Sequence, residues 1–418
     1  MGRSDSMQTA ESADNYRPNP ALRLVLALCA HCPHGRLAMV LPDGSRRVFD
    51  GAAEGPEGEI IVRRDRFARR FMTGGILGFC EAYLDGDWDS PDIGALFEWA
   101  LRNEQAIQRL LQGKAWYRIW STTLHLLKPN TRPGARKNIE AHYDLGNKFY
   151  AKWLDATMTY SSALFERETD TLETAQRRKY DALLSQLRIG PEHSLLEIGC
   201  GWGGFAEHAA REIGCPVTAI TISPAQHEFA AKRIHEAGLA DKVDVRLQDY
   251  RDVAESFDRI ASIEMFEAVG ERYWPAFFNN LRERLTPEGR AALQIITIEE
   301  ERFEDYKRSA DYIQRYIFPG GMLPSIARLR DQVNQAALRW EGLNAFGRSY
   351  AATLRRWNEQ FQRAWPQLAA MGFDERFKRL WEQYLHYCAA GFSVGTIDVV
   401  HLTLSRGDGP DPAALSAR

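Results

Sequence analysis

The sequence predicts an α/β protein: a mostly parallel sheet with helices on both faces, preceded by a smaller module of mixed α+β type. Short apolar segments in the larger part of the chain have the composition of buried strands, at 194–198, 217–221, 243–247, 259–263, 291–298 and 397–404. Helix-like stretches lie between the first five of them. This alternation is typical of a parallel sheet that is covered on both faces.

Composition shifts along the chain predict its organisation. The predicted parts are a disordered leader (1–20), a small N-terminal α+β domain (21–104), a basic, Trp-rich linker (105–138), a main domain (139–405) and a flexible tail (406–418). Within the small domain, strand-like and then helical segments are separated by turns rich in Gly and Pro, at 36–41, 47–49, 59–62, 64–72 and 93–102.

Composition narrows the class of protein. With 44% hydrophobic and 26% charged residues in 418, the chain is typical of a globular protein, and its formal net charge of −3 argues against general coating of nucleic acid. The sequence contains no apolar run of the roughly 18 residues that cross a bilayer, and no signal-peptide core, which predicts a cytoplasmic protein. Cys29-x-x-Cys32 has no second cysteine pair downstream, so no metal site is predicted.

The predicted linker has an unusual charge pattern. Residues 105–138 contain Lys and Arg but no Asp or Glu, and Trp116, Trp120 and several leucines lie among them. Basic residues mixed with Trp and Leu are typical of a segment that contacts an anionic membrane surface. The alternative is an interdomain linker whose aromatic side chains pack on a neighbouring domain. Both interpretations can hold together.

The motif at 195–204, Leu-Leu-Glu-Ile-Gly-Cys-Gly-Trp-Gly-Gly, is an apolar strand that ends in an acidic residue and a glycine turn. Such a turn lets backbone N–H groups and the next helix approach a ligand closely. The spacing departs from the dinucleotide fingerprint, and residues 219–223 lack the acidic residue that the fingerprint requires. A cationic, phosphate-free nucleoside such as S-adenosylmethionine fits this pattern. The alternative is another nucleotide-binding α/β protein.

Polar residues also follow the next three predicted strands. Thr221 and Gln226 can bind the ribose and amino-acid parts of such a nucleoside, and Gln248 with Asp249 can bind an adenine edge. Glu264 and Glu267 follow the fourth strand among apolar residues. Because ligands gather at the carboxyl ends of parallel strands, we expect these groups at one edge of the sheet. Two carboxylates at such a position are candidates for a functional site.

Together these motifs make the chain similar to the cyclopropane-fatty-acyl-phospholipid synthases. The resemblance covers about 139–405 and, more weakly, the small domain. It depends on segments that a generic methyltransferase does not share, which are His142–Tyr150 (His-Tyr-Asp-Leu-Gly-Asn-Lys-Phe-Tyr), Leu154–Ala163, Leu247–Asp252, Glu264–Gly270 (Glu-Met-Phe-Glu-Ala-Val-Gly) and Tyr316–Ser325.

The resemblance implies a Rossmann-like class I methyltransferase sheet with a helical cap, and an enzyme that uses S-adenosylmethionine. The cis double bond of an unsaturated phospholipid attacks the sulfonium methyl group, a carbocation forms, and loss of a proton closes a cyclopropane ring. The expected partners are phospholipid of the inner membrane leaflet and an anionic membrane surface, with the protein, including its small domain, peripheral to the membrane. No nucleic acid partner is expected, and a homodimer is left open beside a monomer.

The resemblance also assigns residues. The predicted cofactor contacts are Tyr160, Ser161, Glu197, Gly199, Gly201, Thr221, Ile222, Gln226, Gln248 and Asp249. The residues expected to line the acyl tunnel are Tyr316, Phe318 and Gly321. In the family a bicarbonate ion beside the cation serves as base, and the matching positions here are Ser162, Glu267, Gln294, Ile296 and Tyr350.

Two of these positions depart from the family's usual pattern. Ser162 stands where many members have Cys, and only its backbone N–H is needed. Gln294 stands where His is common; an amide can hold an anion but cannot carry charge. This departure leaves open a related reaction in which the cation rearranges and loses a different proton, so that the acyl chain is methylated or methylenated without a ring. A non-catalytic lipid-binding protein on the same fold is the third alternative, and small-molecule or nucleic-acid methyltransferases are the remaining ones.

Overall fold

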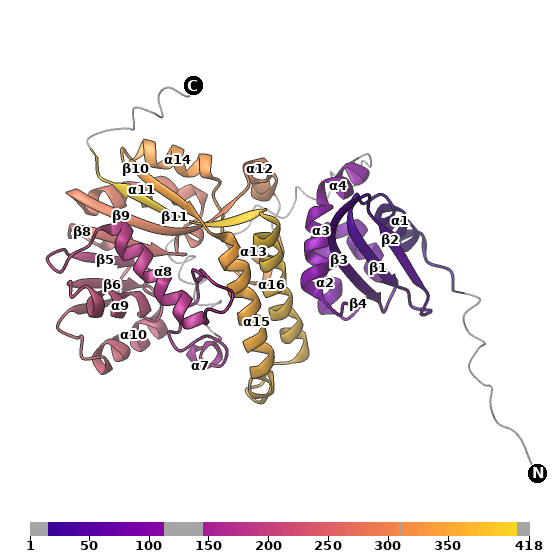
Figure 1. The fold of residues 1–418 in the computed structure, drawn as a ribbon, viewed down its shortest axis with the longest axis horizontal. Coiled ribbons are helices and arrows are strands. Elements are labelled where there is room, and N and C mark those ends of the chain that lie inside the picture. Colours follow the sequence, from indigo (N-terminus) through magenta and orange to yellow (C-terminus); the bar gives the residue numbers. More distant parts are fainter. Residues whose placement is uncertain (1–15, 113–144, 309–310, 408–418) are drawn as a thin grey trace, which may run out of the picture. The chain divides into compact units, whose positions relative to one another are not determined.

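The computed structural model in Figure 1 describes residues 16–112, 145–308 and 311–407. The chain divides into two compact units. Of the described residues, 16–112 and 374–390 belong to unit 1, and 145–308, 311–373 and 391–407 belong to unit 2. The second stretch of unit 1 differs from the sequence-based boundaries, which placed residues 374–390 within the main domain.

Unit 1 contains a 4-stranded sheet in the order β2-β1-β3-β4, in which β1 is antiparallel to β2 and parallel to β3. Its elements are α1 (Pro20–Cys29), β1 (His34–Val40), β2 (Arg46–Asp50), β3 (Ala53–Val62), α2 (Arg66–Leu84), β4 (Trp88–Asp89), α3 (Ile93–Arg102) and α4 (Glu104–Gln112). All five segments expected in this part are present. Residues 105–112, expected in the linker, form most of α4.

Helix α1 was not predicted, although its signals are local. Asn19 accepts a hydrogen bond from the N–H of Leu22 at 2.8 Å, and Pro20 occupies the first helical turn, where a missing N–H costs nothing. Leu22, Val25 and Leu28 then recur at helical spacing and are buried. Helix α2 is longer than predicted because the chain resumes its helix after a kink at Gly75.

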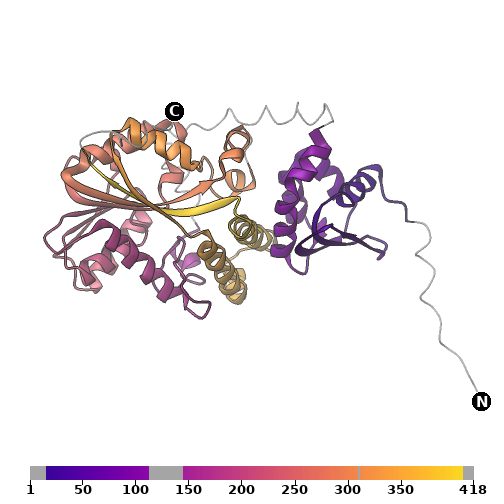
Figure 2. The same ribbon diagram turned by 45° about the horizontal axis from the view of Figure 1, so that its top comes forward.

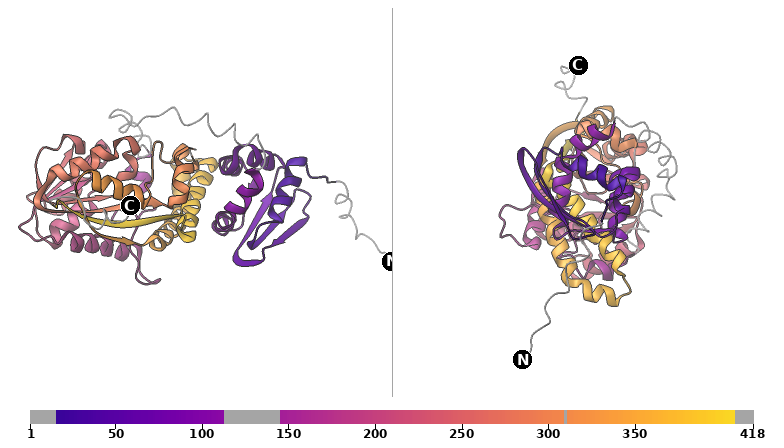
Figure 3. Two further views of the ribbon diagram at one scale, coloured as in Figure 1. Left: turned by 90° about the horizontal axis from the view of Figure 1, so that it is seen from above. Right: turned by 90° about the vertical axis from the view of Figure 1, so that its right-hand side faces the viewer.

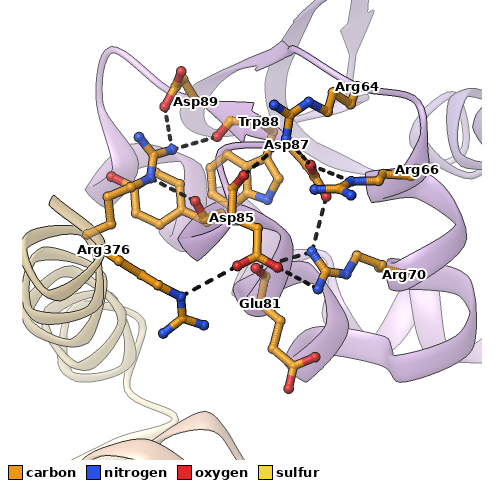
Figure 4. A network of polar contacts seen from close by, with 11 residues as sticks. Arg64, Arg66, Arg70, Glu81, Asp85, Asp87, Trp88, Asp89 and Arg376 are labelled. Carbon is orange, nitrogen blue, oxygen red and sulfur yellow. Dashed lines mark hydrogen bonds and ion pairs between the residues drawn. The ribbon is translucent and has the colours of Figure 1, made fainter.

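A buried carboxylate organises unit 1 (Figure 4). Asp87 is fully buried and accepts hydrogen bonds from Arg66 at 2.7 Å, Arg70 at 3.1 Å and Arg64 at 3.3 Å. Arg379, in α16 (Glu375–Val394), donates to the carbonyl oxygens of Tyr83 and Trp88 at 2.7 and 2.9 Å. These bonds attach the start of α16 to unit 1.

Unit 2 contains a 7-stranded sheet in the order β10-β11-β9-β8-β5-β6-β7. The strands are β5 (Leu195–Ile198), β6 (Val217–Thr221), β7 (Val243–Leu247), β8 (Phe257–Ile263), β9 (Leu285–Ile298), β10 (Arg339–Ala345) and β11 (Ile397–Ser405). Strands β5 to β9 are parallel to their neighbours in that set, whereas β11 pairs antiparallel with β9 and β10 antiparallel with β11. The predicted mostly parallel sheet is confirmed. Strand β10 was not predicted, because its polar, largely exposed sequence lacks the apolar run of a buried strand.

Helices cover both faces of this sheet, as Figures 2 and 3 show. On one face α8 (Leu172–Leu187) and α9 (Gly204–Glu212) form an apolar core with β5 and β6. On the other face α11 (Trp274–Arg284) and α14 (Ile326–Gln335) form a second core with β8, β9 and β11. The aromatic side chains that recur at helical spacing in α15 (Gly347–Ala370), including Trp357 and Phe361, are buried.

The strand order places a topological switch between β5 and β8. The chain proceeds from β5 to β6 and β7 on one side, then returns to pair β8 with the opposite edge of β5. The carboxyl ends of β5 and β8 therefore lie side by side where the connections diverge, which is the usual position of a ligand site in an open α/β sheet. Within the described ranges, no helix is long and apolar enough to cross a membrane.

Candidate active site

The glycine turn after β5 has a backbone that favours glycine. Gly199 has φ +84° and Gly201 has φ +53°, in the left-handed region that other residues rarely adopt. A Cβ atom on Gly199 would lie 2.8 Å from Cγ of Met265, so this glycine permits the close approach of the segment after β8. A Cβ atom on Gly201 would meet no described atom within 4 Å. The space above Gly201, just before the start of α9, can therefore admit a ligand.

Glu197, the acidic residue before this turn, is buried and accepts a hydrogen bond from the backbone of Ala206 in α9. Its Oε2 has no hydrogen-bond partner among the described residues. Burial raises the pKa of Glu197 to about 8, and the positive charge of Lys179 acts in the opposite direction. One carboxylate oxygen of Glu197 thus binds the start of α9, and the other has no hydrogen-bond partner among the described residues.

The predicted cofactor residues after β6 and β7 lie at the same edge. The Thr221 hydroxyl donates to Oε1 of Gln226 at 2.8 Å, and the N–H of Gln248 donates to the carbonyl oxygen of Thr221 at 2.9 Å. The Asp249 carboxylate forms an ion pair with Arg251, with Nη2 to Oδ2 at 2.5 Å. The structure brings these residues together. However, the carboxylate of Asp249, which was expected at an adenine edge, is paired with Arg251. Ile222, between Thr221 and the helix cap Ser223, is partly exposed.

A loop from the cap motif lies over α8. Ser161 accepts a hydrogen bond from Gln176 at its carbonyl oxygen, at 2.9 Å, and one from Nζ of Lys179 at its hydroxyl, at 2.7 Å. The ring of Tyr160 packs against Trp153 and Trp357, with centroid separations of 5.7 and 5.1 Å. Residues 142–144 of the cap motif lie outside the described residues.

Lys179 was not predicted as part of the site. It is fully buried, and burial lowers its pKa to about 7, while the carboxylates of Glu264, Asp155 and Glu197 raise it. Nothing in the sequence distinguishes Lys179 from Arg177 and Arg178 beside it, because only the helical face that each occupies separates a buried cation from a solvated one.

The expected anion site has a different arrangement in the structure. Three of its predicted donors point at the carboxylate of Glu264. The N–H of Ser162 and Nε2 of Gln294 donate to Oε1 at 2.8 and 2.7 Å, and the hydroxyl of Tyr350 donates to Oε2 at 2.5 Å. A side chain of the protein, which the sequence did not assign to this role, thus takes the hydrogen bonds that were expected to hold a bicarbonate ion.

Glu267 and Ile296, the other two residues of the expected anion site, pair with each other. The N–H of Ile296 donates to Oε1 of Glu267 at 2.6 Å, and Oε2 of Glu267 has no hydrogen-bond partner among the described residues. Burial raises the pKa of Glu267 to about 8, and the nearby charge of Glu264 raises it further. Burial also raises the pKa of Glu264, against its three hydrogen bonds, which lower it. Only backbone N–H groups, those of Ile296 and of Glu267 itself, favour the ionised form of Glu267.

The orientation of Gln294 is fixed from behind. Its Oε1 lies 2.9 Å from Nε2 of His401, whose Nδ1 lies 3.1 Å from Nε2 of Gln186. Burial lowers the pKa of His401 to about 3, so the imidazole is neutral at physiological pH. The pattern then assigns one tautomer: Nε2–H donates to Gln294, and Nδ1 accepts from Gln186. This leaves the amide of Gln294 with its N–H group directed at Glu264.

The segment expected to line an acyl tunnel meets the carboxylate pair through the backbone. The N–H of Met322 donates to the carbonyl oxygen of Glu267 at 2.8 Å. The carbonyl oxygen of Gly321 accepts from Gln314 at 2.9 Å, and the N–H of Gly321 donates to the carbonyl oxygen of Phe318. Tyr316 ends α13 (Tyr312–Tyr316) immediately before this turn. The three predicted substrate residues are therefore in a segment that is bonded to Glu267.

The fold and this site define a class I methyltransferase. The family model of mycolic acid cyclopropane synthetase matches residues 130–402, more than half of the chain. A tuberculostearic acid methyltransferase of Mycobacterium tuberculosis is 38% identical over 93% of this chain and 91% of its own length. The cyclopropane-fatty-acyl-phospholipid synthase of Escherichia coli K12 is 35% identical over 84% of this chain and 88% of its own length.

Solved structures agree. The mycolic acid cyclopropane synthase CmaA1, complexed with SAH and CTAB, is 32% identical with a TM-score of 0.62, and the match covers 67% of this chain and 99% of that one. The cyclopropane synthase MmaA2 of Mycobacterium tuberculosis gives a TM-score of 0.61 at 33% identity, over the same shares. The chain belongs to the mycolic acid cyclopropane synthetase family and is an S-adenosylmethionine-dependent methyltransferase that acts on lipid. The predicted family and fold are confirmed.

Substitution of Gly201 tests the cofactor position. We expect Gly201→Val to weaken S-adenosylmethionine binding at least about tenfold, because the side chain would fill the open space above the turn. Gly238→Val is the matched control, since Gly238 also has a positive φ and open space but lies at the end of α10 (Pro224–Glu236). Titration calorimetry measures both. Equal affinity in the two variants would place the cofactor elsewhere.

The raised pKa of Glu267 predicts a pH-dependent stability. A carboxyl group with a pKa of about 8 in the folded protein and an ordinary value in the unfolded chain favours folding at low pH. That contribution is complete below about pH 4.5 and is lost as the pH rises through 8. We therefore expect Glu267→Gln to match the wild-type Tm at pH 4.5 and exceed it by several degrees at pH 8.5. Glu300→Gln, at an exposed position, should show no such trend.

Proposed function

We propose that this enzyme transfers a methyl group from S-adenosylmethionine to the double bond of an unsaturated phospholipid acyl chain, and that its product carries a methyl or methylene branch without a ring. The observation that carries the proposal is the meeting, at one edge of the sheet, of the glycine turn after β5 with the carboxylate pair after β8. The contact of Gly199 with Met265 brings the two segments as close as backbone and side chain allow.

The residues of the chain have separate tasks in this proposal. When bound above Gly201, S-adenosylmethionine supplies the electrophilic methyl group. Ser161, which Lys179 and Gln176 hold in place, and Tyr160 cover the amino-acid end of the cofactor. The turn that contains Phe318 and Gly321, attached to Glu267 through Met322, guides the acyl chain toward the carboxylates. Aromatic faces such as that of Tyr350, which stacks on Phe392 at 4.4 Å, stabilise positive charge on the acyl chain.

The choice of a ring-free product follows from the anion site. In the resemblance, a bicarbonate ion held by five residues serves as the base in the reaction that closes the ring. Ser162, Gln294 and Tyr350 direct their donors at Glu264 instead, which removes that support. The relative with a match over 93% of this chain is, by its name, a tuberculostearic acid methyltransferase. A cyclopropane ring is the second candidate product, and the similarity to the E. coli synthase favours it.

The product can be identified directly. Purified protein is incubated with vesicles of dioleoyl phosphatidylglycerol and S-adenosylmethionine carrying a ¹³C-labelled methyl group. We expect the label in the lipid as an sp³ methyl or an sp² methylene carbon, which ¹³C NMR separates from a cyclopropane carbon. A labelled ring would establish the second candidate. Label in no lipid, with cofactor binding intact, would refute acyl-chain methylation as a whole.

The proposal includes a peripheral position on the membrane, in the cytoplasm, because the acyl chain must be taken from a bilayer. The predicted basic segment supports it, although Arg118, Lys128 and Arg132 lie outside the described residues. Replacing these three by Gln should weaken binding to anionic vesicles, most clearly at low salt, since the Debye length is about 10 Å at 0.1 M. Vesicle flotation measures binding. Replacing the exposed Arg177, Arg308 and Arg363 gives the same charge change elsewhere and should have little effect. Equal losses in both triple variants would show that only net charge matters.

A further inference from the structure

The residue at position 264 has a backbone conformation that favours glycine. Glu264 follows β8 with φ +49°, one of four non-glycine residues with a positive φ in the described part of the chain. Its N–H donates to the carbonyl oxygen of Gln294 at 2.9 Å, which anchors this backbone to β9. A glycine would adopt the same conformation without strain. The presence of a glutamate here therefore calls for a role that its side chain performs.

The hydrogen bonds of that side chain leave one acceptor position open. A carboxylate has about four lone-pair positions. Oε1 of Glu264 accepts from both Ser162 and Gln294, whereas Oε2 accepts from Tyr350 alone. The unused position is thus on Oε2. Because His401 fixes the amide of Gln294 and the chain fixes the N–H of Ser162, the carboxylate is held in one orientation.

These contacts are those expected for a bound anion. The donors that the resemblance assigned to bicarbonate are a backbone N–H, an amide and a phenol, and all three are directed at the carboxylate of Glu264. A free bicarbonate ion in the same place would have to displace the carboxylate of Glu264 from these three donors. The Glu264 carboxylate and a bicarbonate ion in one buried space would repel each other and would compete for the same three donors. Bicarbonate therefore does not fit this site.

We propose that the Glu264 carboxylate is a built-in base that performs the task for which related enzymes are expected to use a bicarbonate ion. The inference depends on the proposed function, since it concerns the proton that the methylated acyl cation must lose. After methyl transfer, a hydride shift can place the positive charge on the methyl-bearing carbon. A C–H bond on a carbon adjacent to the cationic carbon then breaks, and its electron pair becomes the π bond of a C=C double bond, so that the product is a methylene-branched chain or a methyl-branched alkene. The proton passes to Oε2 of Glu264. No oxidant or reductant is required, and the proton leaves to solvent before the next turnover.

The first test is the dependence of the wild-type protein on dissolved carbon dioxide. Methyl transfer from labelled S-adenosylmethionine to dioleoyl phosphatidylglycerol vesicles is measured after rigorous removal of carbon dioxide, with and without added bicarbonate. We expect the two rates to agree within about twofold. A rate that falls more than about tenfold without bicarbonate, and recovers when it is added, would overturn the proposal.

The second test removes the carboxylate in two ways. Glu264→Gln keeps the shape of the side chain, and we expect it to bind S-adenosylmethionine normally but to lose about 100-fold or more in turnover. Glu264→Gly removes the strained backbone together with the side chain and leaves the three donors facing a space for a small anion. We expect this variant to be inactive alone and to regain activity with formate or bicarbonate. A Gln variant with more than a tenth of wild-type turnover, or a Gly variant that binds cofactor but is rescued by neither anion, would contradict the proposal.

A binding measurement separates this inference from the proposed function. ¹³C-labelled bicarbonate should show no binding to the wild-type protein by NMR, whereas Glu264→Gly should bind it. Ala337→Gly is the matched control, because Ala337 also has a positive φ but carries no carboxylate; it should keep wild-type activity and bind no bicarbonate. If the wild-type protein methylated no lipid, the proposed function would fail, and the NMR experiment would still decide whether Glu264 occupies an anion site. Bicarbonate binding to the wild-type protein would overturn that claim.

Discussion

The burial of two carboxylates at the end of a central strand is the constraint on which the site depends. Glu264 and Glu267 follow β8 at the topological switch, and a buried carboxylate must be hydrogen-bonded or neutral. The two carboxylates differ in their hydrogen-bond partners. Glu264 receives hydrogen bonds from the cap loop, β9 and α15, whereas Glu267 receives them only from backbone N–H groups, that of Ile296 in β9 and its own. The cap, sheet and long helix are therefore held together through one carboxylate.

The hydrogen bonds around Glu264 continue to side chains further from the carboxylate. Behind Gln294 lie His401 and Gln186, which connect β11 and α8 to the same carboxylate. On the other side, Lys179 of α8 bonds to Ser161, one residue before the N–H that Glu264 accepts. Helix α8 thus positions both the loop that is expected to cover the cofactor and the carboxylate of Glu264, which we propose as the base. We therefore expect a substitution in α8 to affect both cofactor binding and the loss of the proton.

The sequence was informative wherever a local pattern determines structure. The apolar segments and the glycine turn predicted the parallel part of the sheet correctly. The family resemblance, and not a local pattern, singled out Ser162, Gln294 and Tyr350, three donors that converge on one acceptor. The sequence could not show what these donors bind. The carboxylate of Glu264 lies in front of them because the backbone of Glu264 is left-handed, and nothing in the motif Glu-Met-Phe-Glu reveals that φ angle. Lys179 and His401 were missed for a related reason: their burial is decided by tertiary packing.

The return of α16 to unit 1 has a consequence for biosynthesis. Arg379 bonds to the carbonyl oxygens of Tyr83 and Trp88, so the N-terminal unit is complete only when a segment almost three hundred residues further along the chain has been made. Domains usually fold in order as they emerge from the ribosome. Here unit 1 begins first in the chain, but it is complete only after residues 374–390 have been translated. During that interval the carbonyl oxygens of Tyr83 and Trp88 lack the guanidinium group of Arg379, and a chain interrupted before residue 374 lacks part of both units.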